Sequence, residues 1–231
     1  MSNNTTTNSQ PKSAEPKNNQ CIVLAFDIER SGAFADNHTI GIGASVVDSN
    51  FKELDRLFLP GYSEKDTNFE KRCWDEFWVK IPDRLKELTY NGPLTYDERQ
   101  KEMVESFLTF RDKWAKYAVE NNVKFELASD NNVYDGGFIN QMIFQHTKEH
   151  PIPYLLGSFS GFWESHSMQR GLLFAVDPTY TKKWGFTEHI RKLYDVNVES
   201  KHTHNPADDA HDIAVDMQIL FGIRAGTIKR R

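Results

Sequence analysis

Two acidic residues end the most apolar segment of the chain and are the first candidates for chemistry. Residues 21–28 read CIVLAFDI, a run typical of a strand buried on both faces, and Asp27 and Glu29 lie at its end. Alternation along a strand points residues two apart to the same face. Two carboxylates that close repel each other, and a hard cation such as Mg²⁺ or Mn²⁺ removes the conflict. The alternative interpretation is an ordinary turn at a strand end.

A second acidic segment, SDNNVYDGGF, follows a predicted strand over residues 124–129. Asp135 lies between this strand and a predicted helix, which is where α/β sheets place their functional groups. Asp130 is the other candidate for the site residue of this segment. Because Asp-Asn-Asn is strong turn chemistry, we interpret Asp130 as a turn residue and Asp135 as the candidate site residue.

The third segment, HTHNPADDAHDIAVD, is dense in potential ligands. It contains His202, His204, His211, Asp208, Asp209, Asp212 and Asp216. Asn205 is expected to cap a helix that begins at Pro206, and Asp208 suits the positive end of that helix. The remaining aspartates fit a solvated stripe beside the apolar face of this helix as well as they fit a functional site. The first two histidines fit a turn, or the start of a zinc site that has no evident third ligand nearby.

The elements that must position these residues follow from hydropathy patterns. Strands are predicted over residues 21–28, 39–48, 51–60, 124–129 and 172–178. Helices are predicted over residues 95–121, 138–146, 187–193 and 206–225, and the first opens with a capping box of Thr95 and Glu98. Residues 148–171 are predicted to be a long loop or insertion. This order favours an α/β sandwich around one mixed sheet.

Composition excludes several classes of protein. The 231 residues are 39% hydrophobic and 26% charged, with a net charge of −5, and no apolar run approaches the roughly 20 residues of a membrane span. Two cysteines do not make a disulfide framework and suit a reducing compartment. We expect an intracellular, soluble, cytoplasmic protein. Residues 1–20 are predicted to be a disordered tail, and residues 227–231 a short basic tail.

Taken together, the three segments resemble the motifs of the DEDDh 3′–5′ exonucleases, a DnaQ-like group with an RNase H-like fold. FDIERSG resembles the first motif, DNNVYDGGFI the second, and HNPADDA the third, in which His204 and Asp209 stand five residues apart. The segment 176–196, with Asp177 at the end of the predicted fifth strand, resembles the stretch before the third motif. The resemblance implies one domain over residues 21–226, with three layers and a mixed five-stranded sheet flanked by helices.

The mechanism that this resemblance implies is phosphodiester hydrolysis with two Mg²⁺ or Mn²⁺ ions, roughly 3.5–4 Å apart. Asp27 would bridge both ions. Glu29 and Asp209 would complete the site of the ion that activates water, and Asp135 would hold the other ion. His204 would be the general base, since the ordinary pKa of histidine, about 6.5, suits proton transfer near neutrality.

The resemblance also implies contacts to a nucleic-acid 3′ end. The backbone of Arg30, Ser31 and Gly32 would approach the terminal nucleotide, and Tyr134 would lie beside its base or sugar, with core packing as the alternative. Clustering alone suggests a basic groove of Arg170, Lys182, Lys183, Arg191 and Lys192. Stacking of bases is a hypothesis for Phe159, Phe162 and Trp163. Arg30-Ser31-Gly32, Asp130 and Pro206 depart from the usual motifs, which leaves substrate preference open.

Two other functions remain in competition. One is a non-catalytic nucleic-acid-binding protein that has kept the fold, although all five motif residues are present. The other is a zinc hydrolase built on His202, His204 and His211. The choice between DNA and RNA, the preference for single or double strands, and the oligomeric state stay open.

Overall fold

The computed structural model describes residues 20–147, 162–182, 185–198 and 202–230. The predicted N-terminal tail lies outside this part except for Gln20, and so do residues 148–161 of the predicted long loop. Among the helices that are described, none is both long enough and apolar enough to cross a bilayer.

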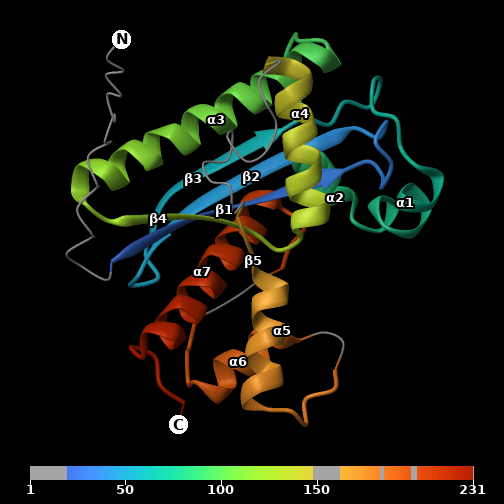
Figure 1. Cartoon of the computed structure of the whole chain (residues 1–231). Helices are drawn as coiled ribbons and strands as arrows, with labels where there is room; N and C mark the ends of the chain where they lie inside the picture. Colours follow the sequence, from blue (N-terminus) through green and yellow to red (C-terminus); the bar gives the residue numbers. More distant parts are fainter. Residues whose placement is uncertain (1–19, 148–161, 183–184, 199–201, 231) are drawn as a thin grey trace, which may run out of the picture.

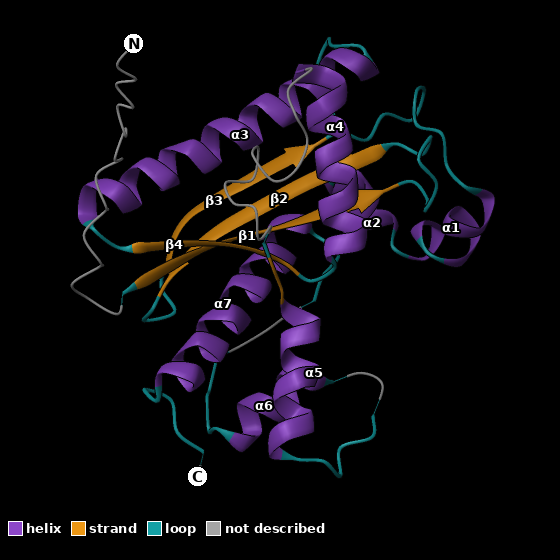
Figure 2. Ribbon diagram, viewed as in Figure 1, coloured by secondary structure: helices purple, strands orange, loops and turns teal. Residues whose placement is uncertain are grey.

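A mixed five-stranded sheet forms the centre of the molecule (Figures 1 and 2). Its strands are β1 (Cys21–Arg30), β2 (Thr39–Asp48), β3 (Glu53–Pro60), β4 (Lys124–Ser129) and β5 (Trp163–Glu164). They are ordered β3-β2-β1-β4-β5 across the sheet. The first three strands form the predicted antiparallel meander, whereas β4 runs parallel to β1 and β5 parallel to β4. The carboxyl ends of β1 and β4 therefore lie side by side at one edge.

Helices cover both faces of this sheet, which confirms the three-layer α/β fold (Figure 1). One face carries α3 (Tyr96–Asn121) and α4 (Gly137–Thr147), and the other carries α5 (Ser165–Val176), α6 (Phe186–Leu193) and α7 (Pro206–Ala225). Three short helices lie between β3 and α3, namely α1 (Lys71–Glu76), the 3₁₀ turn η1 (Trp78–Lys80) and α2 (Pro82–Glu87). They surround a small core that includes Trp78 and Leu88.

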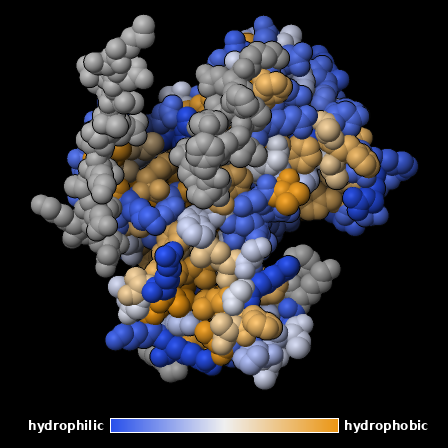
Figure 3. Space-filling view, in the orientation of Figure 1, coloured by the Kyte–Doolittle hydropathy of each residue, from blue (hydrophilic) through white to orange (hydrophobic). Residues whose placement is uncertain are grey.

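The pleat of β1 divides the core into two halves. Ile22, Leu24, Phe26 and Ile28 face α3 and α4, whereas Val23 and Ala25 face α7. Apolar side chains are visible between α7 and α5 in the space-filling view (Figure 3). The row that faces α7 continues along β1 to Asp27 and Glu29, so the packing of the strand already fixes the side of the sheet on which these carboxylates lie.

A buried ion pair ties the helices of the second face together. Arg191 on α6 donates to Asp216 on α7 over 2.7 Å, and Gln169 of α5 and Thr187 of α6 donate to the other oxygen of Asp216. Asp216 is 9% exposed. The suggestion that this aspartate belongs to a solvated stripe is therefore wrong: its charge is taken from water and compensated by a guanidinium and two hydrogen bonds.

The predicted helix starts are confirmed. Thr95 accepts the backbone N–H of Glu98, and Glu98 in return accepts the backbone N–H of Thr95, so the capping box of α3 is complete. Asn205 accepts the backbone N–H groups of Ala207 and Asp208 at the start of α7. Gly226 ends α7 in the left-handed conformation, with φ of 73°.

The predicted fifth strand over residues 172–178 is wrong, because Ser165–Val176 forms α5. The buried residues of α5 are Ser165, Gln169 and Leu173, a spacing of four that belongs to a helix. A short apolar run does not distinguish a buried strand from one face of a helix. Asp177 follows α5 and pairs with His189 instead of ending a strand. The fifth strand is the two-residue β5, within the segment predicted to be irregular.

Two glycines of β2 allow α7 to approach the sheet closely. Gly43 pairs with Asp27 and Gly41 pairs with Glu29 across the two strands. A Cβ atom on Gly43 would lie 2.0 Å from the backbone carbonyl carbon of Pro206, and one on Gly41 would lie 3.2 Å from the Pro206 ring. Since cross-strand partners share a face, these missing side chains leave room for the first turn of α7 beside the β1 carboxylates.

We expect Gly43→Ala to lower the free energy of unfolding by about 1–3 kcal/mol, because the methyl group meets the α7 backbone and forces the helix away from the sheet. Gly171→Ala is the matched control. Nothing lies within 4 Å of a Cβ at this exposed position of α5, so the change should raise stability by up to about 1 kcal/mol through helix propensity. Denaturant unfolding measures both, and equal stability of the two variants would contradict the packing argument.

Candidate functional site

The first turn of α7 brings Asp209 to the carboxylates of β1. Asp209 is 4% exposed, and its two oxygens accept the backbone N–H groups of Thr203 and His204 over 2.8 and 2.9 Å. These bonds fix the carboxylate at the positive end of the helix. One oxygen each of Asp27, Glu29 and Asp209 lies within 4.8 Å of the others. Residues far apart in the chain thus form one group of three acids.

A second group of three acids forms around the same Asp27. Asp130 follows β4 directly, and Asp135 lies in η2 (Asn132–Gly136), a π-helical turn before α4. One oxygen each of Asp27, Asp130 and Asp135 lies within 4.8 Å of the others. Because β4 is parallel to β1 and next to it, residues that follow the two strands meet at the same edge of the sheet.

Asp130 is the site residue that the sequence interpretation missed. The turn that follows β4 depends on its neighbour instead, because the Asn131 side chain accepts the backbone N–H of Tyr134 over 3.1 Å. A signal for Asp130 was present in the sequence: like Asp27, it comes at the end of an apolar run that forms a strand, and Asp135 follows five residues later.

Burial and mutual repulsion raise the pKa values of the whole cluster. Burial, and then the negative charge of Asp27 and the contact with Asp130, raise the pKa of Asp135 to about 11. Burial likewise raises the pKa of Asp209 to about 6, against the opposing effect of its backbone hydrogen bonds. The pKa values of Asp27 and Glu29 are also raised, first by burial and then by neighbouring carboxylates. Without a counter-charge, the site holds protons that ordinary carboxylates release.

The donor set fits hard divalent cations. Both groups offer carboxylate oxygens alone, which are the ligands that Mg²⁺ and Mn²⁺ prefer. Asp135 is 3% exposed, and its Oδ2 atom is buried without a hydrogen-bond partner. A buried oxygen without a partner costs free energy, and a cation would satisfy it. Asp27 contributes an oxygen to both groups, so the two groups share one carboxylate.

His204 lies beside the first group of acids in a constrained conformation. Its φ of 58° is left-handed, and its ring meets Phe77 edge-on with centroids 4.7 Å apart. Burial, with smaller effects from His202 and Arg84, lowers the pKa of His204. The imidazole is therefore neutral at neutral pH and able to accept a proton.

The histidines of the third segment separate in space. His202 lies next to His204, with ring centroids 4.3 Å apart. His211 points elsewhere, because its Nδ1 atom lies 3.4 Å from the Ser45 hydroxyl and 3.5 Å from a Glu53 oxygen. A zinc hydrolase built on all three histidines is therefore excluded by the geometry.

A cavity of about 370 Å³ opens onto the acid cluster from the side of α5 and α6. Asp130, His202 and Asp209 line it, together with Gln169 and Phe186 from the two helices. Asp212 and Asp216 add further carboxylates to its wall. The cavity is strongly acidic, so a phosphate would enter it only when cations are bound.

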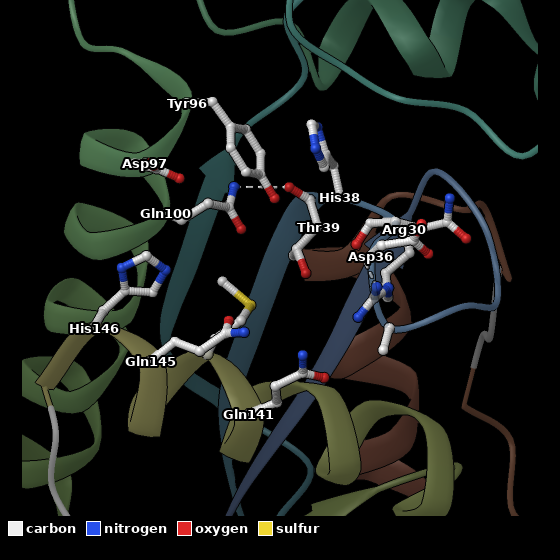
Figure 4. A pocket seen from close by; sticks show the side chains of 13 residues that line it. Arg30, Asp36, His38, Thr39, Tyr96, Asp97, Gln100, Gln141, Gln145 and His146 are labelled. Carbon is white, nitrogen blue, oxygen red and sulfur yellow. Dashed lines mark hydrogen bonds between the residues drawn. The ribbon is translucent and has the colours of Figure 1, made fainter.

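The residues after Glu29 lie in a different environment from the acids. Arg30 points to the α4 face, where its guanidinium carbon lies 3.3 Å from the centroid of the Phe138 ring and where it donates to the carbonyls of Phe34 and Asn37. It lines a second cavity, of about 470 Å³, between α3, α4 and the start of β2 (Figure 4). There Gln100 donates to the Thr39 carbonyl over 2.9 Å.

Ser31, Gly32 and Tyr134 are held by contacts within the chain. The Ser31 hydroxyl donates to the Asn68 carbonyl over 2.6 Å and accepts the N–H of His38. The Tyr134 hydroxyl donates to the carbonyl of Gly32 over 3.3 Å, which links the loops that follow β1 and β4. A Cβ on Gly32 would lie 2.4 Å from the Asn37 side chain, so the chain passes closely here.

Several residues suggested for a nucleic-acid groove make contacts within the chain. Arg191 is buried against Asp216, and the Arg170 guanidinium lies over Phe186. Phe162 packs edge-on against Phe26, and Trp163 packs against Phe221. Lys182 is exposed, whereas Lys183 and Phe159 lie outside the described residues.

Comparisons with known proteins agree on the architecture. No protein-family model and no curated protein sequence matches the chain. The structure matches Escherichia coli exonuclease I in complex with a dT13 oligonucleotide, with a TM-score of 0.59 and 14% identity over 90% of this chain and 43% of that chain. A product-bound exonuclease I matches with a TM-score of 0.58 and 13% identity over 90% of this chain and 46% of that one.

The exonuclease I of Methylocaldum szegediense matches with a TM-score of 0.57 and 13% identity, over 89% of this chain and 43% of that chain. The chain thus spans slightly less than half the length of the exonuclease I structures that it matches. At this level of sequence identity, the matches show only that the folds are alike. Together with the strand order β3-β2-β1-β4-β5, the matches show that this chain has the RNase H-like fold of these exonuclease I structures.

Proposed function

We propose that the chain is a 3′–5′ exonuclease that hydrolyses phosphodiester bonds of DNA or RNA and releases nucleoside 5′-monophosphates. The observation that carries the proposal is that Asp27 belongs to two groups of three carboxylates at once. A single structural cation would need only one such group. The fold shared with exonuclease I supports the same class of reaction.

The position of each residue in the cluster indicates its proposed role. Mg²⁺ or Mn²⁺ at the two groups would supply positive charge that stabilises the attacking and leaving oxygens of the phosphoryl group. Asp27 would touch both ions, with Glu29 and Asp209 completing one site. Asp135 and Asp130 would complete the other. The backbone N–H groups of Thr203 and His204 hold the Asp209 carboxylate in place.

His204 would take the proton of the attacking water. Its lowered pKa leaves the ring neutral at neutral pH, and its edge-on contact with Phe77 limits ring rotation. The hydrogen bond from its own backbone to Asp209 ties the position of the base to the position of the acids. Geometry of this kind is what a general base needs, because proton transfer requires a fixed distance to the water.

We expect 3′-labelled and 5′-labelled single strands to shorten from the 3′ end in Mg²⁺ or Mn²⁺. His204→Ala should lower kcat by about 10²–10⁴-fold, the usual contribution of a general base. Asp27→Asn should lower it at least as much, because both carboxylate groups lose a member. His211→Ala, a change on α7 that leaves the acid cluster intact, is the control and should retain activity.

Two results would contradict this proposal. Full activity of His204→Ala or Asp27→Asn would remove the roles assigned to these side chains. Strand binding without release of nucleotides at any concentration of either metal would instead identify a non-catalytic nucleic-acid-binding protein.

The raised pKa values predict how stability depends on pH and metal. The metal-free folded protein binds protons more tightly at Asp209 than the unfolded chain, which titrates near 3.8, so this contribution to stability is lost as pH rises through about 6. Divalent ions should therefore raise Tm at pH 7.5 and raise it less at pH 5, where protons compete for the oxygens.

Asp27→Asn should have opposite effects in the two states, which calorimetry measures at pH 7.5. In chelator its Tm should exceed that of the wild type, by roughly 2–4 °C for each kcal/mol of repulsion removed. In Mg²⁺ or Mn²⁺ the variant should lose most of the increase in Tm that these ions give the wild type. Asp112→Asn on the exposed side of α3 is the control and should show the wild-type metal shift. A wild-type shift in Asp27→Asn would refute metal binding at this cluster.

Asp130→Asn separates a ligand from a turn residue. If Asp130 holds a cation, the variant should need about 10–100-fold more Mn²⁺ for half-maximal activity, while its metal-free Tm stays the same or rises. If Asp130 only shapes the turn, the metal requirement should stay unchanged and Tm should fall. Metal titration of activity and thermal unfolding in chelator distinguish the two.

A further inference from the structure

Two histidines and one aspartate form a further donor set beside the acid cluster. One ring nitrogen each of His202 and His204 and one oxygen of Asp209 lie within 4.8 Å of one another. His202 Nδ1 lies 3.4 Å from Asp209 Oδ2. Two ligands of a tetrahedral zinc ion stand about 3.3–3.4 Å apart, given bond lengths of about 2.0–2.1 Å. The spacing of this pair thus already suits one shared ion.

Two of the three ligands are held rigidly, and the third is accessible. Asp209 is fixed by two backbone N–H groups, and the His204 ring rests against Phe77. The His202 side chain is 66% exposed and lines the cavity of about 370 Å³. An ion can therefore reach Asp209 and His204 from that cavity, and the exposed His202 side chain can turn to become the third ligand.

We infer that His202, His204 and Asp209 form a site for a borderline-soft divalent cation such as Zn²⁺. Imidazole nitrogen favours zinc over magnesium, whereas the two carboxylate groups offer oxygen alone. Three protein ligands leave a fourth coordination position open. Among the described residues, this is the cluster that combines histidine with a carboxylate for such an ion.

An ion at this site would inhibit the enzyme, and this consequence rests on the proposed function. Asp209 belongs both to this set and to the group of Asp27 and Glu29, so the two sites compete for its carboxylate. The same ion would occupy a ring nitrogen of His204, which then no longer accepts a proton. Zinc would thus block the general base and one ion site together.

Titration of the full chain with Co²⁺ tests the site without any assay of activity. Four-coordinate Co²⁺ absorbs in the visible, and Zn²⁺ binds such sites more tightly and should abolish the band by displacing it. We expect one Co²⁺ per wild-type chain at this band. His202→Ala should weaken its binding at least about tenfold, because a direct ligand is lost. His211→Ala and Asp27→Asn should both retain the band, since neither residue belongs to the set.

Unchanged cobalt affinity in His202→Ala would overturn the assignment. So would the opposite pattern, in which Asp27→Asn loses the cobalt band and His202→Ala keeps it.

Inhibition is measured separately, as nucleotide release in excess Mg²⁺ with added Zn²⁺. With each rate expressed relative to that protein's own rate without Zn²⁺, His202→Ala should need at least about tenfold more Zn²⁺ for half inhibition. Equal inhibition of both proteins would overturn the regulatory step. A chain without nuclease activity that still shows the cobalt band would refute the proposed function and leave the metal site standing.

Discussion

Repulsion among buried carboxylates is the constraint that the rest of this structure serves. Five acidic side chains converge where β1 and β4 end, and burial raises the pKa values of four of them. A fold does not hold such groups together unless other interactions outweigh the repulsion. Here the core on both faces of β1, the cap of α7 and the backbone donors to Asp209 do so.

The pleat of one strand also separates two kinds of environment. Glu29 and Arg30 are neighbours in the chain, yet Glu29 joins the carboxylates of Asp27 and Asp209, whereas Arg30 lines the amide-rich cavity beside α4. A guanidinium on the acid side would neutralise the cluster and displace a cation. Placed on the opposite face, Arg30 instead organises the loop that follows β1, through the carbonyls of Phe34 and Asn37.

Features that depend on local chemistry were predictable from the sequence. The meander, the capped starts of α3 and α7, and the paired orientation of Asp27 and Glu29 each follow from residues close together in the chain. Features that depend on distant partners were not. The α5 segment reads as a strand because its apolar run is short, and Asp130 reads as a turn residue because its role appears only beside Asp27. Arg191 carries no sequence signal of its buried partner, Asp216.

The order of the ligands along the chain has a consequence for synthesis. Asp27 and Glu29 are made first, whereas Asp209 belongs to α7, which packs against β1 and β2 over the two glycines. A ribosome-bound chain that has not yet released α7 therefore lacks one carboxylate and the neighbouring imidazole. Since domains fold as units and their amino-terminal parts emerge first, the complete site arises only after α7 has emerged and packed against the sheet.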